Sequence, residues 1–252
     1  ERVILSGASA KDYAEWIKIK RKNSEVKHTS DDVFTPPCVY ENVLKFVKSE
    51  WGELIKGKRI MRPFYPGGNY LKEDYTNAVV IDNPPFSLNA AILDYYVLNN
   101  IPFFLFAPSL TAGTTLSVRK HLTLVCDKNG TVTYKNDVKV CTAFFTNLDR
   151  LANQEPRIML GRDVIQQEEQ QALKRPPNEY INIAKIASCT KVLDIPLKEC
   201  SFYDKSLDGK RVFGRGINLP ADILNLINAN RAERGLRLLK NDKEPDRQRA
   251  LL

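Results

Sequence analysis

The sequence is poor in metal-binding residues and has no apolar run long enough to cross a bilayer. The longest apolar candidate, residues 101–108, has the length of a buried strand, whereas a spanning helix needs about 18 apolar residues. The chain has two histidines and five cysteines, and no Cys-x-x-Cys pair occurs. No zinc cluster can be written at the usual ligand spacings, so we expect neither a membrane helix nor a metal site.

The cysteines also favour a reducing compartment. Their number is odd, and Cys126 and Cys141, which could face each other across a hairpin, are interpreted as two unlinked thiols. The first residues show no signal-peptide pattern, and the sequence begins with Glu1 instead of methionine, which is typical of a trimmed start. We therefore expect a cytoplasmic protein.

Positive charge is concentrated at the two ends of the chain. The net charge is +8, with six Lys or Arg against three acids in residues 11–28 and ten against five in residues 209–252. For either end alone we favour a solvated helix face. The overall balance points to an acidic partner, most simply nucleic acid. With 43% hydrophobic residues the chain is too apolar to be disordered, and its length suits one large domain or a core with an appendage.

The periodicity of the first half predicts an α/β domain. Two helices precede the first strand, over residues 9–22 and 39–54, and a polar loop separates them. Ser87 is in position to cap a later helix. Short apolar strands are expected over residues 59–64, 78–81 and 102–107. Apolar strands that alternate with helices predict a parallel sheet covered on both faces.

The second half reads as antiparallel and mixed structure. Asp127–Gly130 is predicted to be a hairpin turn between strands at 122–126 and 131–134. Residues 151–180 are polar and predict a loop with some helix. The other expected elements are a strand at 138–146, strand-like pieces at 181–186, 191–195 and 211–213, and a last helix beginning at Pro220 with Arg231, Arg234 and Arg237 exposed.

The segment Asp82-Asn-Pro-Pro-Phe-Ser87 directly follows a predicted buried strand and precedes a helix. Ligands of doubly wound sheets bind there, at the carboxyl ends of the strands. An exocyclic amine is a poor nucleophile because its lone pair is delocalised into the ring. The Asn83 side-chain oxygen and the Pro84 carbonyl could accept its two hydrogens and release that lone pair. Pro85 stiffens the loop, and Phe86 offers a flat face on which a ring can stack. The alternative is a proline-rich turn without chemistry.

Asn-Pro-Pro-Phe is the catalytic signature of S-adenosylmethionine-dependent amino-methyltransferases, which act on adenine N6, cytosine N4 or glutamine amides. The chain resembles this family over residues 30–150. Phe34-Thr-Pro-Pro37 is similar to an element that lies against the cofactor, and Pro63-Phe-Tyr-Pro-Gly-Gly68 is similar to the cofactor loop. The resemblance implies that the catalytic residues are Asn83, Pro84, Pro85 and Phe86, and that S-adenosylmethionine is held by Phe34, Thr35, Pro36, Pro63, Phe64, Gly67, Gly68 and Asp82.

The fold implied is a Rossmann-like methyltransferase sheet, shortened in its first half. We expect an N-terminal helix and basic loop (1–30), a methyltransferase-like core (31–150) and an α+β extension (151–252) that could recognise DNA. Arg62 stands where the family has an acidic residue, and Pro66 replaces its first loop glycine. Only residues 69–81 separate the loop from Asp82, where ordinary members place two strand–helix units.

The function favoured by the sequence is methylation of adenine N6 in DNA, since the whole chain looks most like phage or prophage adenine methylases. The departures from the family favour an alternative, a degenerate methyltransferase fold that binds nucleic acid or a partner without catalysis. A third reading is an RNA or protein-glutamine methyltransferase. A protein partner or a second copy of the chain would complete a shortened cofactor site.

Other features leave two readings open. Asp82 could hold the cofactor's amino group or cap the following helix. Tyr65 and Tyr70 could stack on a cofactor ring, although packing is the more common role of such tyrosines. Residues 111–115 are interpreted as a surface loop, and Phe213-Gly-Arg-Gly-Ile-Asn-Leu-Pro220 is interpreted as a hinge between strand and helix.

Overall fold

The computed structural model describes residues 35–65, 68–134, 139–166, 181, 183–187, 189–207 and 210–241. The chain divides into two units, Glu1–Val33 and Phe34–Leu252, and the described residues belong to the second. The helix predicted over residues 9–22 lies outside the described residues, as do Phe34, Pro66 and Gly67.

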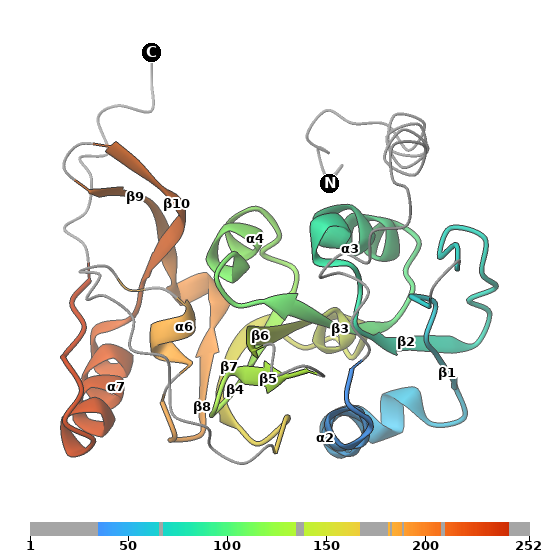
Figure 1. The fold of residues 1–252 in the computed structure, drawn as a ribbon, viewed down its shortest axis with the longest axis horizontal. Helices are drawn as coiled ribbons and strands as arrows, with labels where there is room; N and C mark the ends of the chain where they lie inside the picture. The colour runs from blue at the N-terminus through green and yellow to red at the C-terminus, as the bar shows by residue number, and fades with distance from the viewer. Residues whose placement is uncertain are drawn as a thin grey trace. The chain divides into compact units, whose positions relative to one another are not determined.

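An eight-stranded mixed sheet forms the centre of the second unit (Figure 1). Its order is β1-β2-β3-β6-β4-β7-β8, and β5 pairs with β6. The pairs β1–β2, β2–β3 and β4–β7 are parallel, whereas β6 is antiparallel to both of its neighbours. The strands are β1 (Arg59–Met61), β2 (Ala78–Asp82), β3 (Phe103–Pro108), β4 (Thr123–Asp127), β5 (Thr131–Thr133), β6 (Lys139–Thr146), β7 (Arg157–Arg162) and β8 (Leu193–Pro196). This α/β architecture agrees with the predicted class and is compatible with a Rossmann-like sheet.

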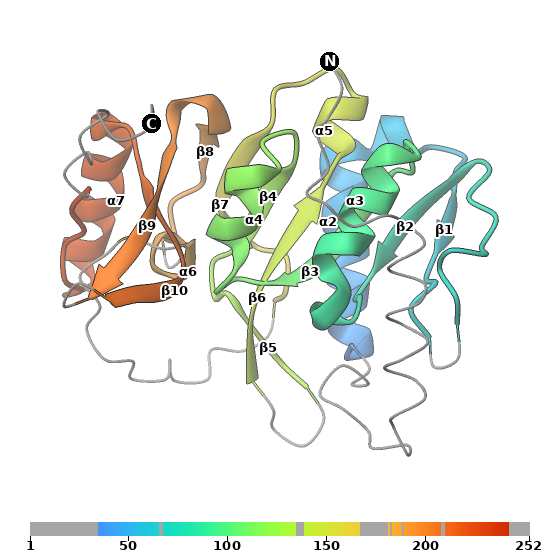
Figure 2. The same ribbon diagram turned by 90° about the horizontal axis from the view of Figure 1, so that it is seen from above.

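Helices cover both faces of the sheet: α2 lies on one face, and α3 and α4 lie on the other (Figures 1 and 2). A second, two-stranded sheet follows the main one. The remaining elements are α2 (Pro37–Ile55), η2 (Phe86–Leu88), α3 (Asn89–Leu98), α4 (Ala112–Val118), α5 (Leu148–Leu151), α6 (Ile183–Ile186), η4 (Leu197–Glu199), β9 (Ser201–Leu207), β10 (Lys210–Asn218) and α7 (Ala221–Glu233). Among the described residues, no helix is both long and apolar enough to cross a membrane.

Neighbouring residues of β3 pack on opposite faces of the sheet, as the alternation of side chains along a strand requires. Phe104 contacts Trp51 of α2, with ring centroids 6.0 Å apart, and stacks on Phe144 of β6 at 5.1 Å. Phe103 contacts Tyr96 of α3 at 5.8 Å. Phe103, Phe104 and Phe106 are fully buried, as expected for the buried strand predicted within residues 101–108.

The predicted hairpin at Asp127–Gly130 is wrong. Strands β4 and β5 do not pair with each other; both pair with the long strand β6, through Thr123–Val125 and Thr131–Thr133 respectively. A turn is nevertheless present, because Asp127 Oδ1 accepts the backbone N–H groups of Asn129 and Gly130. The turn therefore connects two strands that run in the same direction and pair with successive parts of β6. Among the described cysteines, Cys126 and Cys141 form no disulfide.

The region after residue 150 departs most from expectation. Residues 151–180 were predicted to form a loop with some helix, but β7 lies within them, and the strand expected at 181–186 contains helix α6. The surface loop expected at 111–115 is the start of α4, which packs on β10: a Cβ at Gly113 would lie 2.9 Å from the Arg215 carbonyl oxygen. The hinge expected after Phe213 is strand β10. Helix α7 follows Pro220 as predicted.

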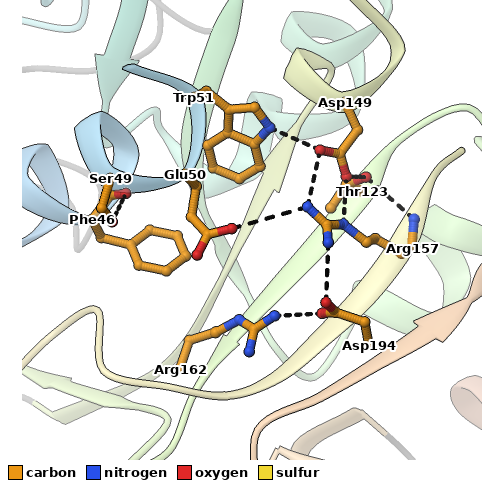
Figure 3. Close-up of polar contacts among 9 residues, drawn as sticks. All are labelled: Phe46, Ser49, Glu50, Trp51, Thr123, Asp149, Arg157, Arg162 and Asp194. Carbon is orange, nitrogen blue, oxygen red and sulfur yellow. Dashed lines mark hydrogen bonds and ion pairs between the residues drawn. The ribbon is translucent and has the colours of Figure 1, made fainter. Parts of the chain in front are cut away.

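One buried carboxylate joins four elements at the amino-terminal edge of the parallel strands (Figure 3). Asp149 of α5 accepts hydrogen bonds from Trp51 Nε1 (2.7 Å), Thr123 Oγ1 (2.7 Å) and Arg157 Nε (3.0 Å). Arg157 also pairs with Asp194 of β8, on the outer side of the cluster. The cluster therefore ties α2, α5, β4 and β7 together at the edge of the sheet opposite Asp82.

Candidate functional site

The Asp82–Phe86 segment lies at the carboxyl ends of the parallel strands β1, β2 and β3. Asp82 is the last residue of β2, and a single turn of 3-10 helix, η2, separates the segment from α3. That turn makes the prediction for Ser87 wrong: neither η2, preceded by Pro85, nor α3, preceded by Leu88, has a side-chain cap. The segment nevertheless occupies the edge of the sheet where ligands of α/β proteins bind.

The Asn83 amide has one partner. Its Nδ2 donates a hydrogen bond of 3.3 Å to Tyr134 Oη, while its Oδ1 is buried and has no hydrogen-bond partner among the described residues. A buried acceptor without a donor costs about 1–3 kcal/mol. Asn83 Oδ1 is therefore an unused acceptor, and it is the atom that the sequence predicts to accept an amine hydrogen. Pro84 is buried, and Pro85 and Phe86 are half-buried.

Asp82 neither caps α3 nor faces solvent. It is 2% exposed; its Oδ2 accepts the Phe64 backbone N–H at 3.0 Å, and its Oδ1 pairs with Arg62 Nε at 3.2 Å. Burial raises the pKa of the Asp82 carboxyl, and these hydrogen bonds and Arg62 oppose the rise. The carboxylate thus fastens the loop after β1 to the end of β2, which rules out the helix-cap reading.

Arg62 is held from a second side by α2. Its guanidinium carbon lies 3.9 Å from the centroid of the Tyr40 ring, within the range of a cation–π contact. Tyr40 in turn donates a hydrogen bond of 3.0 Å to the Ile81 carbonyl, one residue before Asp82. Burial raises the pKa of Tyr40 to about 12, so it stays neutral beside the ion pair. Arg62 therefore joins α2, β1 and β2.

The loop after β1 is closed by its own contacts. Gly68 donates its backbone N–H to the Tyr65 carbonyl at 2.8 Å, and a Cβ there would lie 2.7 Å from the Pro63 carbonyl oxygen. Glycine is thus required by the turn itself. Tyr70 is buried against Phe64, with ring centroids 5.7 Å apart, whereas Tyr65 is 56% exposed. Tyr70 therefore has the packing role.

The residues predicted to form the site are brought together in part. Phe64 and Asp82 are in direct contact, and Asn83 follows Asp82 in the chain. Thr35 and Pro36 lie just before α2, where Thr35 Oγ1 is buried and has no hydrogen-bond partner in the described part of the chain. Among the described residues, no hydrogen bond joins Thr35, Pro36 or Gly68 to the Asp82–Phe86 segment. Phe34 and Gly67 lie outside the described residues.

Sequence reasoning missed two residues of the site. Tyr40 lies on a helical stripe that reads as ordinary core packing. Tyr134 ends a strand that was predicted to pair with β4; in the structure that strand pairs with β6, and Tyr134 reaches Asn83. The sequence did contain one signal of this altered site, which is Arg62: its positive charge stands where the family resemblance places an acidic residue.

Replacing Arg62 by alanine is expected to make stability depend more strongly on pH. The change removes the cation beside the buried Asp82 carboxyl, so the pKa of that carboxyl, already raised in the folded chain, rises further. The folded chain then binds the proton more tightly than the unfolded chain. The free energy of unfolding therefore falls as pH increases from the unfolded pKa, about 3.9, through the folded value.

Urea denaturation between pH 4 and pH 8 measures this effect. Because the Arg62 side chain is 45% exposed, solvent screens the pair, and we expect a loss of about 1 kcal/mol at pH 8 that nearly disappears at pH 4. Arg59→Ala is the matched control, since Arg59, three residues earlier in β1, donates to the Asp74 backbone carbonyl instead of a buried carboxylate. Equal loss at both pH values in Arg62→Ala would contradict the role assigned to the pair.

Comparison with known proteins yields no relative. A scan against protein-family models finds no match, and no curated protein and no solved structure matches the chain.

Proposed function

We propose that the protein transfers a methyl group from S-adenosylmethionine to the exocyclic N6 amino group of adenine in DNA. The observation that carries this proposal is the Asn83 amide at the carboxyl end of β2, whose buried Oδ1 receives no hydrogen bond from any residue that the structure describes. An amine hydrogen is the donor that this acceptor requires. The family resemblance of the Asn83–Phe86 segment supplies the reaction class.

The residues of the segment have distinct roles in this proposal. Asn83 Oδ1 and the Pro84 carbonyl accept the two amine hydrogens and draw the amine toward tetrahedral geometry, which frees its lone pair for attack. Phe86 stacks on the base after the base leaves the duplex. Pro84 and Pro85 limit the motion of the loop, so both acceptors are positioned before the substrate arrives. No covalent intermediate with the protein is needed.

The strand order supports the resemblance. In the sequence, only residues 69–81 stand where the family places two strand–helix units, and in the structure β1 pairs directly with β2. Since β1 already has β2 on one side, the missing units would extend the sheet beyond β1. The antiparallel strand β6 lies between β3 and β4 and continues the sheet on the other side of the segment. The proposed fold is thus a methyltransferase sheet without its outer strands.

The charged residues beside the segment fit the amino-acid end of S-adenosylmethionine, which carries cationic and carboxylate groups. Asp82 would attract the cationic part and Arg62 the carboxylate, while Thr35 Oγ1 is a buried polar atom to which no other described residue bonds. Pro63, Phe64 and Gly68 would line the cofactor site with apolar side chains and backbone groups. The bound cofactor supplies an activated methyl group. The protein's part is to hold the amine in line with that group.

A second candidate is a degenerate methyltransferase fold that binds nucleic acid or a protein partner without catalysis. The observation that favours it is the Arg62–Asp82 pair, because a carboxylate that is already paired is a weaker ligand for a cofactor. DNA is the proposed partner in both cases. Exposed basic residues near the C-terminal helix, Arg234, Arg237 and Lys240, suit phosphate contacts, whereas Arg231 is buried and donates to the Arg237 carbonyl, which corrects its predicted exposure.

Nucleoside mass spectrometry tests the proposal. Mixed-sequence duplex DNA is incubated with the protein and S-adenosylmethionine, and the digested nucleosides are compared with a reaction that lacks the cofactor. N6-methyladenine in the complete reaction is the expected product. N4-methylcytosine would keep the chemistry and correct the base. Retention on a DNA column without any methylated base, at high protein and cofactor concentration, would favour the binding module.

A further inference from the structure

We propose that Tyr134 is the positioning residue that holds the Asn83 side chain in place for methyl transfer. This inference rests on the proposed function. An asparagine amide presents an acceptor on one side and a donor on the other, and rotation by half a turn exchanges them. An Asn83 amide turned the wrong way would offer N–H groups to an amine that itself donates. The reaction therefore needs a group that restrains the Asn83 side chain.

Tyr134 is placed to do so. Its Oη accepts the hydrogen bond from Asn83 Nδ2 at 3.3 Å, which leaves Oδ1 on the other side as the unused acceptor. Tyr134 is 6% exposed, so water does not readily replace this partner. Burial raises the pKa of Tyr134 to about 12, so the bond keeps the same form across the working pH range.

The position of Tyr134 comes from the unusual strand arrangement. Tyr134 follows β5, which pairs with residues 139–141 of β6, beyond the part of β6 that pairs with β3. The hairpin of β5 and β6 therefore projects past the carboxyl end of β3, toward the edge that holds Asn83 (Figure 2). Val132, in the middle of β5, is fully buried and anchors this hairpin. The hairpin thus supports the catalytic segment from a distance of about 50 residues along the chain.

Tyr134→Phe keeps the ring and removes only Oη. We expect kcat for adenine methylation to fall about tenfold, because the variant loses the hydrogen bond that holds the Asn83 side chain in place. The KM for DNA should stay within about twofold, because the contact acts on the amide and not on substrate binding. Val132→Ala is the matched control on the same hairpin: it lowers Tm through lost packing but keeps the hydroxyl, and its kcat should stay within about threefold of wild type.

A stability cycle gives a readout that is independent of activity. The shift in Tm caused by Tyr134→Phe is expected to shrink in an Asn83→Ala background, because the bond is already absent there. A Tyr134→Phe enzyme with wild-type kcat, or a Val132→Ala enzyme with the same loss of kcat, would overturn the inference and leave the proposed function standing. A wild-type protein that retains DNA but methylates nothing would overturn the proposed function and the inference with it.

Discussion

Asn83→Ala is expected to lower methyl transfer by at least about 10²-fold, the scale of losing one positioned hydrogen-bonding group at a reaction centre. The alanine removes the buried acceptor that the amine hydrogen requires, and the remaining carbonyl acceptor of Pro84 cannot free the lone pair alone. The fold should change little, because within the described residues the Asn83 side chain makes a single hydrogen bond, to Tyr134. Nucleoside mass spectrometry on a timed reaction gives the rate, and a DNA-binding titration gives the affinity.

Two further variants sharpen this test. Asn83→Asp keeps acceptor oxygens at the same place, and we expect it to retain more activity than alanine. Asn99→Ala is the matched control, because Asn99 at the end of α3 is exposed and bonds only the Tyr95 carbonyl. Undiminished methylation by Asn83→Ala would remove the proposed mechanism. Loss of DNA affinity together with activity would assign Asn83 to binding.

Asp149→Ala is expected to have the largest effect on stability, a loss of about 3–5 kcal/mol in the free energy of unfolding. Asp149 is 1% exposed and receives donors from three residues, Trp51, Thr123 and Arg157. Alanine leaves the Trp51 and Thr123 donors without this acceptor, at the junction of two helices and two strands. The Arg157 guanidinium loses its buried partner and keeps its pair with Asp194. Urea denaturation followed by tryptophan fluorescence measures the change directly, since Trp51 is itself one of the donors.

Asp194→Ala is the control within the same cluster. Asp194 pairs with Arg157 and Arg162; its side chain is 40% exposed, whereas that of Arg162 is 10% exposed. Water reaches the Asp194 position, so the expected loss is smaller than for Asp149, about 1–2 kcal/mol. Similar losses in the free energy of unfolding for Asp149→Ala and Asp194→Ala would show that the buried Asp149 contributes no more than a surface ion pair.

The half of the fold built from local signals was predictable. The apolar run of β2, the helix after it and the apolar run of β3 each carry their own pattern, and all three are present, with β2 and β3 parallel. Strand β7 was missed because Arg157 and Arg162, at its two ends, read as loop residues. Both arginines are turned toward carboxylates that come from other parts of the chain. Such partners are visible only after the chain has folded.

The sequence predicts the residues of the catalytic segment, but it does not predict the residues that hold this segment in place. Asn83, Pro84, Pro85 and Phe86 are contiguous, so their order alone predicts where they lie. Tyr134 and Arg62 act through long-range contacts, with Asn83 and with Asp82 respectively. The position of Tyr134 depends on which strand β5 joins, and a turn sequence between β4 and β5 cannot distinguish pairing with β4 from pairing with β6.

The place of β6 in the sheet has a consequence for synthesis on the ribosome. Strand β6 lies between β3 and β4 but follows both in the chain, so a nascent chain that ends before residue 139 leaves both strands with an unpaired edge. Exposed apolar strand edges are sites of intermolecular association. The emerging chain therefore gains protection from aggregation only when residues 139–146 leave the exit tunnel, and truncation before this point is expected to yield insoluble fragments.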